Sequence, residues 1–291
     1  MPWRTLFVTL ALLFGCQGAP GDGTVVIGSK NFTEQVILGE LLAQQIEAHT
    51  DLPVVRKLNL GGTFICHKAL VAGDITAYVE YTGTALTAIL EEPPTYDPDT
   101  VFQTVQVAYR ERFGAEWLPP LGFTNTFAII VRREAAATYG LRSVSDLARV
   151  APQWRAAFGY EFLERADGYP GLAETYLLKF AEPPKVMDLA LTYQALADGQ
   201  VDVIAGDSTN GLIQRLDLMI LDDDKRYFPP YDAAPVVSAA ALARHPKLRE
   251  ALGALAGVLS NKTMQQLNYL VDGEKRSVQE VVRAFRAEYA L

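Results

Sequence analysis

The alternation of apolar and polar positions near the start of the chain predicts a buried strand that leads directly into a helix. Residues 25–27 are three consecutive β-branched residues, the pattern of a strand covered on both faces. The polar stretch 28–31 interrupts that pattern, and Thr33 is placed to begin a helix. From Leu38 to Ile46 apolar residues recur at the spacing of one helical face, so this helix is expected to pack on the sheet.

The residues between this strand and this helix are the first candidate binding site. In open α/β sheets, ligands bind beyond the carboxyl ends of the strands, where helix N-termini point. Lys30, Asn31 and Phe32 occupy that position and suit a small anionic or zwitterionic ligand. An ordinary strand-to-helix turn would explain the same stretch.

Strand and helix patterns alternate along the rest of the chain, which predicts an α/β protein. We expect strands at residues 53–60, 75–80, 127–131, 158–165 and 201–205, and helices at residues 63–73, 101–113, 246–259, 263–270 and 277–289.

One unit of helix, glycine, strand and polar turn occurs twice. Residues 69–75 lead to the turn 81–84, and residues 195–201 lead to the turn 207–210 at the same spacing. The repetition suggests two pseudo-equivalent lobes that each present one polar turn to a shared cleft. The first residues of the two turns, a tyrosine and an aspartate, would then face each other. Units of this kind also recur in α/β proteins in general, so the repeat alone leaves both interpretations open.

The first sixteen residues have the pattern of an export signal. Arg4 precedes an apolar run, residues 6–14, that is too short to span a bilayer. The run ends in a stretch that resembles the lipobox of bacterial lipoproteins, in which Cys16 is lipidated and becomes the first residue after cleavage. Residues 17–24 would then tether the protein to the membrane. The alternative is plain secretion, with Cys16 lost in the cleaved peptide.

Composition and charge exclude several classes of function. Hydrophobic residues make up 49% of the 291 residues, enough for a globular core, and the formal net charge of −8 argues against nucleic acid as a partner. The three histidines lack metal-ligand spacing, and the phosphate-loop and dinucleotide motifs are absent. We therefore expect no metal and no cofactor. Cys66 is expected to be a structural thiol, because its neighbour His67 points in another direction on the same helix.

One short motif favours an enzyme. Gly206, Asp207 and Ser208 resemble the nucleophile block of GDS-type lipases and esterases. In those enzymes the block lies near the N-terminus, and an aspartate stands three residues before the catalytic histidine. Here the block lies two thirds of the way along the chain, and His245 has Leu242 at that position. These two departures weaken the match, and hydrolysis is kept only as the alternative function from another class of protein.

Taken together, eight stretches identify a family. They are GSKNFTEQ, NLGGT, AGDITAYVEYTGTAL, GFTNTFA, DGYPGL, GQVDVIAGDSTNG, FPPYDAAP and LNYLVD. In this order, from residue 25 to about residue 285, they resemble the substrate-binding proteins of ABC importers for glycine betaine, choline and related quaternary amines.

The resemblance implies a type II periplasmic-binding-protein fold and its organisation. Each lobe would be a central β-sheet flanked by helices, with residues 25–125 and 232–291 in lobe 1 and residues 126–231 in lobe 2. A hinge between the lobes would let them close around the ligand. The protein would be a monomeric, lipid-anchored extracytoplasmic lipoprotein, in the periplasm or on the outer face of the membrane, that delivers its ligand to an ABC permease.

The resemblance also implies roles for individual residues. A quaternary ammonium has no N–H group, so aromatic faces hold it by cation–π attraction. Tyr81 and Tyr231 match two walls of the family's aromatic cage, and Thr84, Lys30 and Arg165 match its carboxylate partners. The complete set of predicted ligand-binding residues is Lys30, Asn31, Phe32, Tyr81, Thr84, Asn125, Phe127, Arg165, Asp207, Ser208 and Tyr231.

Three of these positions depart from the family pattern. Phe127 replaces a third cage tyrosine, Asp207 replaces a fourth, and Asn125 stands where an aspartate is common. Glycine betaine or choline remains the first expectation for the ligand. Asp207 also favours ligands with N–H donors, such as ergothioneine or an amino acid. A sensory or structural lipoprotein that binds nothing is a further alternative, which the presence of both tyrosines and both cations disfavours.

Overall fold

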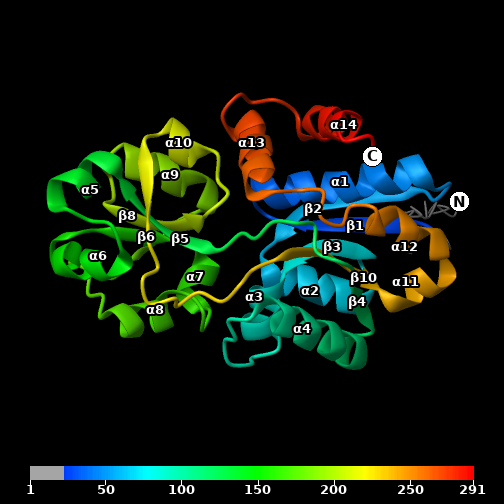
Figure 1. Ribbon diagram of the computed structural model, residues 1–291, viewed down its shortest axis with the longest axis horizontal. Coiled ribbons are helices and arrows are strands. Elements are labelled where there is room, and N and C mark those ends of the chain that lie inside the picture. The colour runs from blue at the N-terminus through cyan, green and yellow to red at the C-terminus, as the bar shows by residue number, and fades with distance from the viewer. Residues whose placement is uncertain (1–22) are drawn as a thin grey trace, which may run out of the picture.

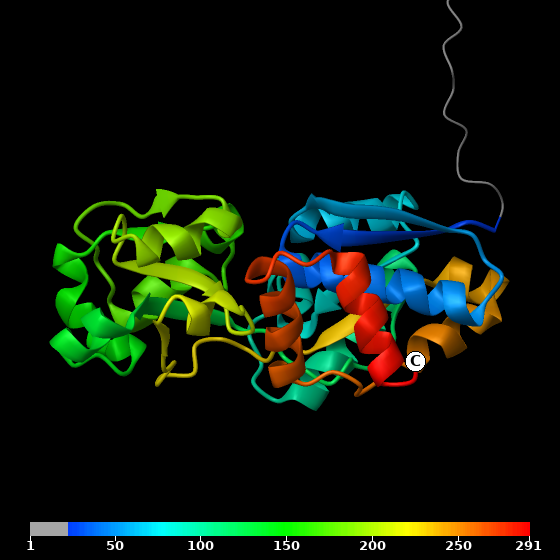
Figure 2. The same ribbon diagram turned by 90° about the horizontal axis from the view of Figure 1, so that it is seen from above.

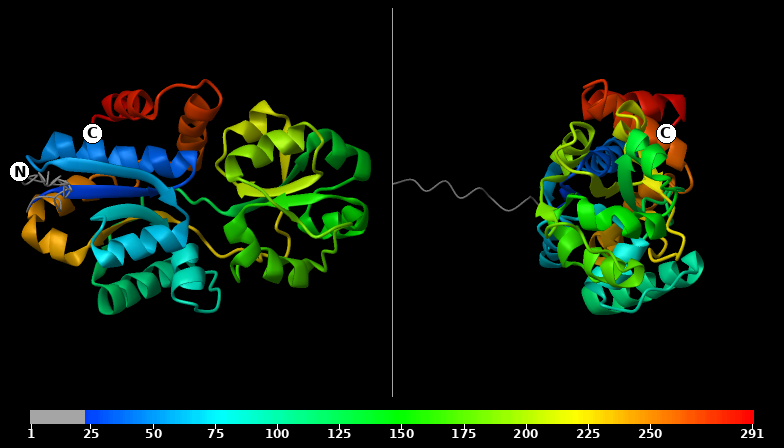
Figure 3. Two further views of the ribbon diagram at one scale, coloured as in Figure 1. Left: turned by 180° about the vertical axis from the view of Figure 1, so that it is seen from behind. Right: turned by 90° about the vertical axis from the view of Figure 1, so that its left-hand side faces the viewer.

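Two α/β lobes lie side by side in the computed structural model, which describes residues 23–291 (Figure 1). Two segments of chain cross between the lobes, one before β5 and one before β10, and both are visible from behind in Figure 3. The predicted signal peptide, the predicted lipidation site Cys16 and most of the predicted tether lie outside the described residues. Within residues 23–291, no helix combines the length and the apolar character needed to cross a bilayer.

The lobe that contains the N-terminal strand, here called the first lobe, has a five-stranded sheet of order β2-β1-β3-β10-β4. Its strands are β1 Val25–Lys30, β2 Val54–Gly61, β3 Ala77–Tyr81, β4 Ala115–Trp117 and β10 Ala233–Ser238. Its helices are α1 Thr33–His49, α2 Thr63–Ala72, α3 Thr82–Thr84, the π-helix η1 Ala85–Ile89, α4 Pro98–Phe113, α11 Ala239–Arg244, α12 Pro246–Gly253, α13 Asn261–Asp272 and α14 Val278–Glu288.

The second lobe has a sheet of order β7-β6-β8-β5-β9. Its strands are β5 Phe127–Arg132, β6 Ala156–Phe158, β7 Lys185–Val186, β8 Val203–Asp207 and β9 Leu218–Leu221. Its helices are α5 Arg133–Tyr139, α6 Val144–Val150, the 3-10 helix η2 Ala151–Gln153, α7 Tyr160–Glu164, α8 Tyr169–Tyr176, α9 Leu189–Ala197 and α10 Leu212–Arg215.

The two sheets share one topology. In each, the central strand (β3 or β8) lies beside an antiparallel strand (β10 or β5) whose chain has just crossed from the other lobe. Three parallel strands complete the matching part, β2, β1 and β3 in one lobe and β7, β6 and β8 in the other. The predicted two-lobed α/β fold is confirmed, and the repeated sequence unit marks its two central strands.

Both faces of the first sheet are covered by helices. One apolar cluster packs α1, α12, α13 and α14 against one face, and a second packs α2 and α4 against the other (Figure 1). Cys66 lies in the second cluster, fully buried and unpaired, as expected of a structural thiol. Seen from above, α13 lies at the side of the first lobe that faces the second (Figure 2).

The prediction of a strand at residues 158–165 is wrong. The strand β6 ends at Phe158, and residues 160–164 form the helix α7. Within this segment Phe162 is buried while Tyr160 and Glu164 are exposed, which is a helical rather than an alternating pattern. The long helix expected at residues 246–259 is also shorter, because α12 ends at Gly253.

Candidate functional site

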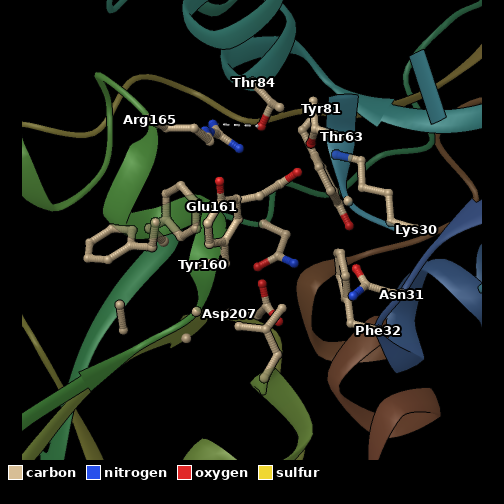
Figure 4. Close-up of a pocket in the computed structure, with 18 of the residues that line it drawn as sticks. Lys30, Asn31, Phe32, Thr63, Tyr81, Thr84, Tyr160, Glu161, Arg165 and Asp207 are labelled. Carbon is tan, nitrogen blue, oxygen red and sulfur yellow. Dashed lines mark hydrogen bonds between the residues drawn. The ribbon is translucent and has the colours of Figure 1, made fainter. Parts of the chain in front are cut away.

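A cleft of about 540 Å³ lies between the lobes and is lined by both. In Figure 4, Arg165, Tyr160 and Glu161 stand on the side of the second lobe, and Lys30, Asn31 and Phe32 stand opposite. The structure places ten of the eleven predicted residues on its wall: Lys30, Asn31, Phe32, Tyr81, Thr84, Asn125, Phe127, Arg165, Asp207 and Tyr231.

The fold brings these residues together through strand ends. Lys30, Tyr81 and Asp207 are the last residues of β1, β3 and β8, so the carboxyl ends of strands from both sheets meet at the cleft. Phe127 begins β5 directly after one crossing segment, and Tyr231 lies at the end of the other. Two of the aromatic residues that line the cleft therefore stand next to the crossing segments.

Ser208 is the exception among the predicted residues. Its Oγ accepts a hydrogen bond from the N–H of Thr126 at 3.2 Å and contacts Oδ1 of Asn125 at 3.4 Å. It does not line the cleft, and it supports the crossing segment instead.

Lys30 already has an internal partner. Its Nζ lies 2.5 Å from Oε1 of Glu80, and both side chains are buried. The same ammonium lies 4.8 Å from the centre of the Tyr81 ring, and the Phe32 ring stacks on Tyr81 with centroids 6.5 Å apart. Lys30 thus orders an aromatic wall, and its charge is compensated by Glu80, a residue that the sequence analysis did not single out.

Arg165 is paired in the same way. Its Nε and Nη2 donate to the two carboxylate oxygens of Asp167 at 2.8 and 2.5 Å, and Nη2 also donates to Oγ1 of Thr84 at 3.1 Å (Figure 4). Although burial acts in the opposite direction, the guanidinium holds the pKa of Asp167 below its usual value. The hydroxyl of Tyr231 donates to Asp167 at 2.7 Å, and the guanidinium lies 4.9 Å from the centre of the Phe127 ring.

Glu34 is the functional residue that the sequence analysis missed. Its buried carboxylate accepts hydrogen bonds from four side chains: Tyr81 Oη at 2.6 Å, Asn125 Nδ2 at 2.8 Å, Thr209 Oγ1 at 2.5 Å and Asn268 Nδ2 at 3.1 Å. Burial raises the pKa of Glu34 despite these bonds. Thr209 belongs to the second lobe, so Glu34 links Tyr81 and a crossing segment to both lobes. Its position in the helix-start stretch FTEQ suggested only a first-turn residue.

Asp207 is one of three acidic residues that line the cleft, together with Glu161 and Asp188. Burial, followed by the nearby charge of Glu34, raises the pKa of Asp207 to about 7. Its backbone is fixed by Tyr193, whose hydroxyl accepts from the N–H of Asp207 at 2.8 Å. Asp207 and Tyr81 line the same cleft from opposite lobes, as the repeated sequence unit suggested.

Comparisons with known proteins agree on one kind of protein. The family model described as the substrate-binding domain of ABC-type glycine betaine transport systems matches residues 23–288. The carnitine transport binding protein OpuCC of Listeria monocytogenes is 37% identical over 97% of this chain and 91% of its own length. A solved structure of a glycine betaine/carnitine/choline ABC transporter protein is 34% identical, with a TM-score of 0.75 over 91% of this chain and 98% of that one.

A third relative has a different ligand in its name. The ergothioneine transport permease/ergothioneine binding protein EgtU of Helicobacter pylori is 33% identical over 96% of this chain. The match covers 50% of that longer protein.

Proposed function

Because this chain belongs to the family of substrate-binding domains of ABC-type glycine betaine transport systems, we propose that it captures a small quaternary amine outside the cytoplasm and delivers it to an ABC permease. The ligand binds in the cleft between the lobes, and the segments that cross near residues 125–126 and 231–232 act as the hinge.

The observation that carries this proposal is the set of aromatic side chains around one cleft. Phe32, Tyr81, Phe127 and Tyr231 line it from strand ends and from the hinge. Aromatic faces attract a cation that has no N–H to donate, by about 0.5–2 kcal/mol each. Thr84, Asn125 and Arg165 also line the cleft and place polar groups beside the aromatic residues.

Glycine betaine, carnitine and choline are the ligands that this cleft suits best. Ergothioneine is the second candidate, because Asp207 places a carboxyl group where it can accept a hydrogen bond from an imidazole-thione N–H. An amino acid is disfavoured as the ligand. Its primary ammonium carries N–H groups that need hydrogen-bond acceptors, and the aromatic side chains of the cleft suit a cation without N–H groups.

The proposal extends to the location of the protein and to its lack of catalysis. We place it on the outer side of the membrane, anchored through Cys16 and monomeric. Hydrolysis is disfavoured because no histidine among residues 23–291 hydrogen-bonds Ser208, whose hydroxyl is bonded to the hinge.

A thermal-shift panel on protein that begins after Cys16 tests the function. The panel contains glycine betaine, carnitine, choline, ergothioneine and several amino acids. A ligand at about 100 times its Kd stabilises the folded state by roughly 2.7 kcal/mol, a clear shift in Tm. Shifts with quaternary amines are expected, and a folded protein that responds to none of them would overturn the proposal.

A further inference from the structure

Among residues 23–291, both cations that line the cleft are already paired with acidic side chains. Lys30 is neutralised by Glu80, and Arg165 is neutralised by Asp167. Three further acidic residues, Glu161, Asp188 and Asp207, line the same cleft. A carboxylate that enters this cleft therefore needs another partner to offset its loss of hydration.

The N-terminus of α2 offers such a partner. The first N–H groups of a helix have no acceptor within the helix, and they carry its positive partial charge. No hydrogen bond inside the described chain satisfies the N–H of Thr63 or Phe64, and both residues line the cleft. The Thr63 side chain is itself 1% exposed, and its Oγ1 has no hydrogen-bond partner among residues 23–291. A buried hydroxyl that lacks a partner is costly, so it calls for a ligand atom.

A carboxylate of the protein already lies against this helix end. A Cβ placed on Gly62, the residue before α2, would lie 2.0 Å from Oε1 of Glu161 and 3.1 Å from Oε2. The carboxylate of Glu161 therefore reaches across the cleft from α7 of the second lobe and packs on the glycine backbone. The Glu161 carboxylate accepts no hydrogen bond within the described residues. It therefore lies at the N-terminus of α2 while the Thr63 hydroxyl stays without a hydrogen-bond partner.

We infer that the N-terminus of α2 is an anion-binding subsite of the cleft, which takes the carboxylate of the ligand and which Glu161 occupies in its absence. The inference rests on the proposed function. An untethered ligand carboxylate can adopt the hydrogen-bond geometry that Glu161, held by α7, does not reach. Thr63 and the adjacent N–H groups donate to it, while the aromatic walls hold the trimethylammonium group.

Dissociation constants for three ligands in two variants test this subsite. Carnitine and glycine betaine carry a carboxylate, and choline has the same trimethylammonium group without one. Thr63→Val should weaken binding of the two carboxylates by about three- to tenfold and leave choline within about twofold. Glu161→Gln should strengthen binding of the carboxylates by about threefold or more and leave choline unchanged or weaker. The ratio of the Kd for choline to the Kd for carnitine should therefore fall in Thr63→Val and rise in Glu161→Gln.

Controls separate this role from a structural one. Glu164→Gln removes the same charge from the exposed end of α7 and should leave the preference unchanged. Thr63→Ser retains the hydroxyl and should restore carboxylate binding. Thr63→Val removes a buried hydroxyl that has no partner, so the Tm of this variant should equal or exceed that of the unmodified protein.

The outcomes also separate the two claims. If quaternary amines bind but both variants change carnitine and choline equally, or change neither, the subsite is wrong and the proposed function stands. If no quaternary amine binds the unmodified protein, the proposed function falls and the subsite falls with it.

Discussion

At the scale of single residues, Glu34 connects more of the binding site than any cage residue does. One buried carboxylate accepts from Tyr81, from the crossing segment at Asn125, and from Thr209 in the other lobe. Its neighbour in space, Asn268, also donates to the backbone oxygen of Thr209. A carboxylate is suited to this position because it presents only acceptors to four donors.

Replacing Glu34 with glutamine should therefore disturb both stability and binding. The amide nitrogen would face donors, which leaves buried groups unpaired at a cost of about 1–3 kcal/mol. Urea unfolding measures this loss, and calorimetry should show weaker ligand binding because the Tyr81 hydroxyl loses its acceptor. Glu47→Gln, on the same helix at a side chain that is 42% exposed, should cost less than about 1 kcal/mol. Equal effects of the two substitutions would contradict this role.

Asp207 predicts a pH dependence of ligand binding. Its raised pKa of about 7 means that the carboxyl group is mostly neutral at pH 6 and mostly ionised at pH 8. Only the ionised form attracts a cation, so affinity should rise with pH through 7, by at most about tenfold per pH unit. Calorimetry with choline from pH 5.5 to 8.5 measures the rise, because choline itself does not titrate there. Asp207→Asn should flatten the profile, and parallel profiles for the two proteins would rule out Asp207 as the titrating group.

At the scale of elements, the start of α3 depends on the absence of a side chain. A Cβ on Gly83 would lie 2.6 Å from the carbonyl oxygen of Pro230 and 2.9 Å from the ring of Tyr231. The glycine thus lets β3 and its following helix contact the returning hinge segment. The ring of Tyr231 is 1% exposed, so it has little room to move.

Gly83→Ala should therefore displace the Tyr231 wall. Overpacking of this kind costs about 1–3 kcal/mol, and ligand affinity should fall as the ring shifts. Denaturant unfolding and calorimetry measure the two effects. Gly253→Ala is the matched control, because nothing lies within 4 Å of its added Cβ and it ends the helix α12. The control should be neutral or stabilising by about 0.5 kcal/mol, and a similar loss in both variants would refute the packing argument.

The sequence predicted the strand ends at the cleft and the aromatic residues that line it, because they follow from local pattern and from motif. It did not predict the acidic partners of the two cations in the cleft. Glu80 lies 50 residues from Lys30, and Asp167 lies only two residues after Arg165, yet neither ion pair was predicted. The contact of the two cations with a ligand carboxylate stays a prediction. The segment 158–165 was misassigned because its aromatic residues favour strands, whereas Gly159 ends the strand and a helical turn follows.

At the scale of the whole molecule, the lobes touch along a seam at α13 as well as through the hinge. Gln265 and Asn268 of α13 donate to the backbone oxygens of Ser208 and Thr209 in the second lobe, at 3.1 and 3.0 Å. Further along the seam, Arg215 of α10 donates to the oxygen of Gly273 at 2.6 Å. These contacts follow the turn after β8, so the turn that presents Asp207 to the cleft also fixes how closely the lobes approach.

Gly211 in this seam offers a way to open the lobes without touching the cleft. A Cβ there would lie 2.6 Å from the backbone N and Cα of Tyr269 in α13, and backbone atoms of a helix cannot turn aside as a side chain can. The φ of −66° suits alanine, so Gly211→Ala should wedge the lobes apart rather than unfold either one. Small-angle scattering should give a larger radius of gyration than for the unmodified protein or for Gly253→Ala. Apparent affinity should fall in proportion to the loss of the closed state, and saturating ligand should restore the compact scattering curve. Unchanged scattering together with unchanged affinity would mean that the seam does not limit the approach of the lobes.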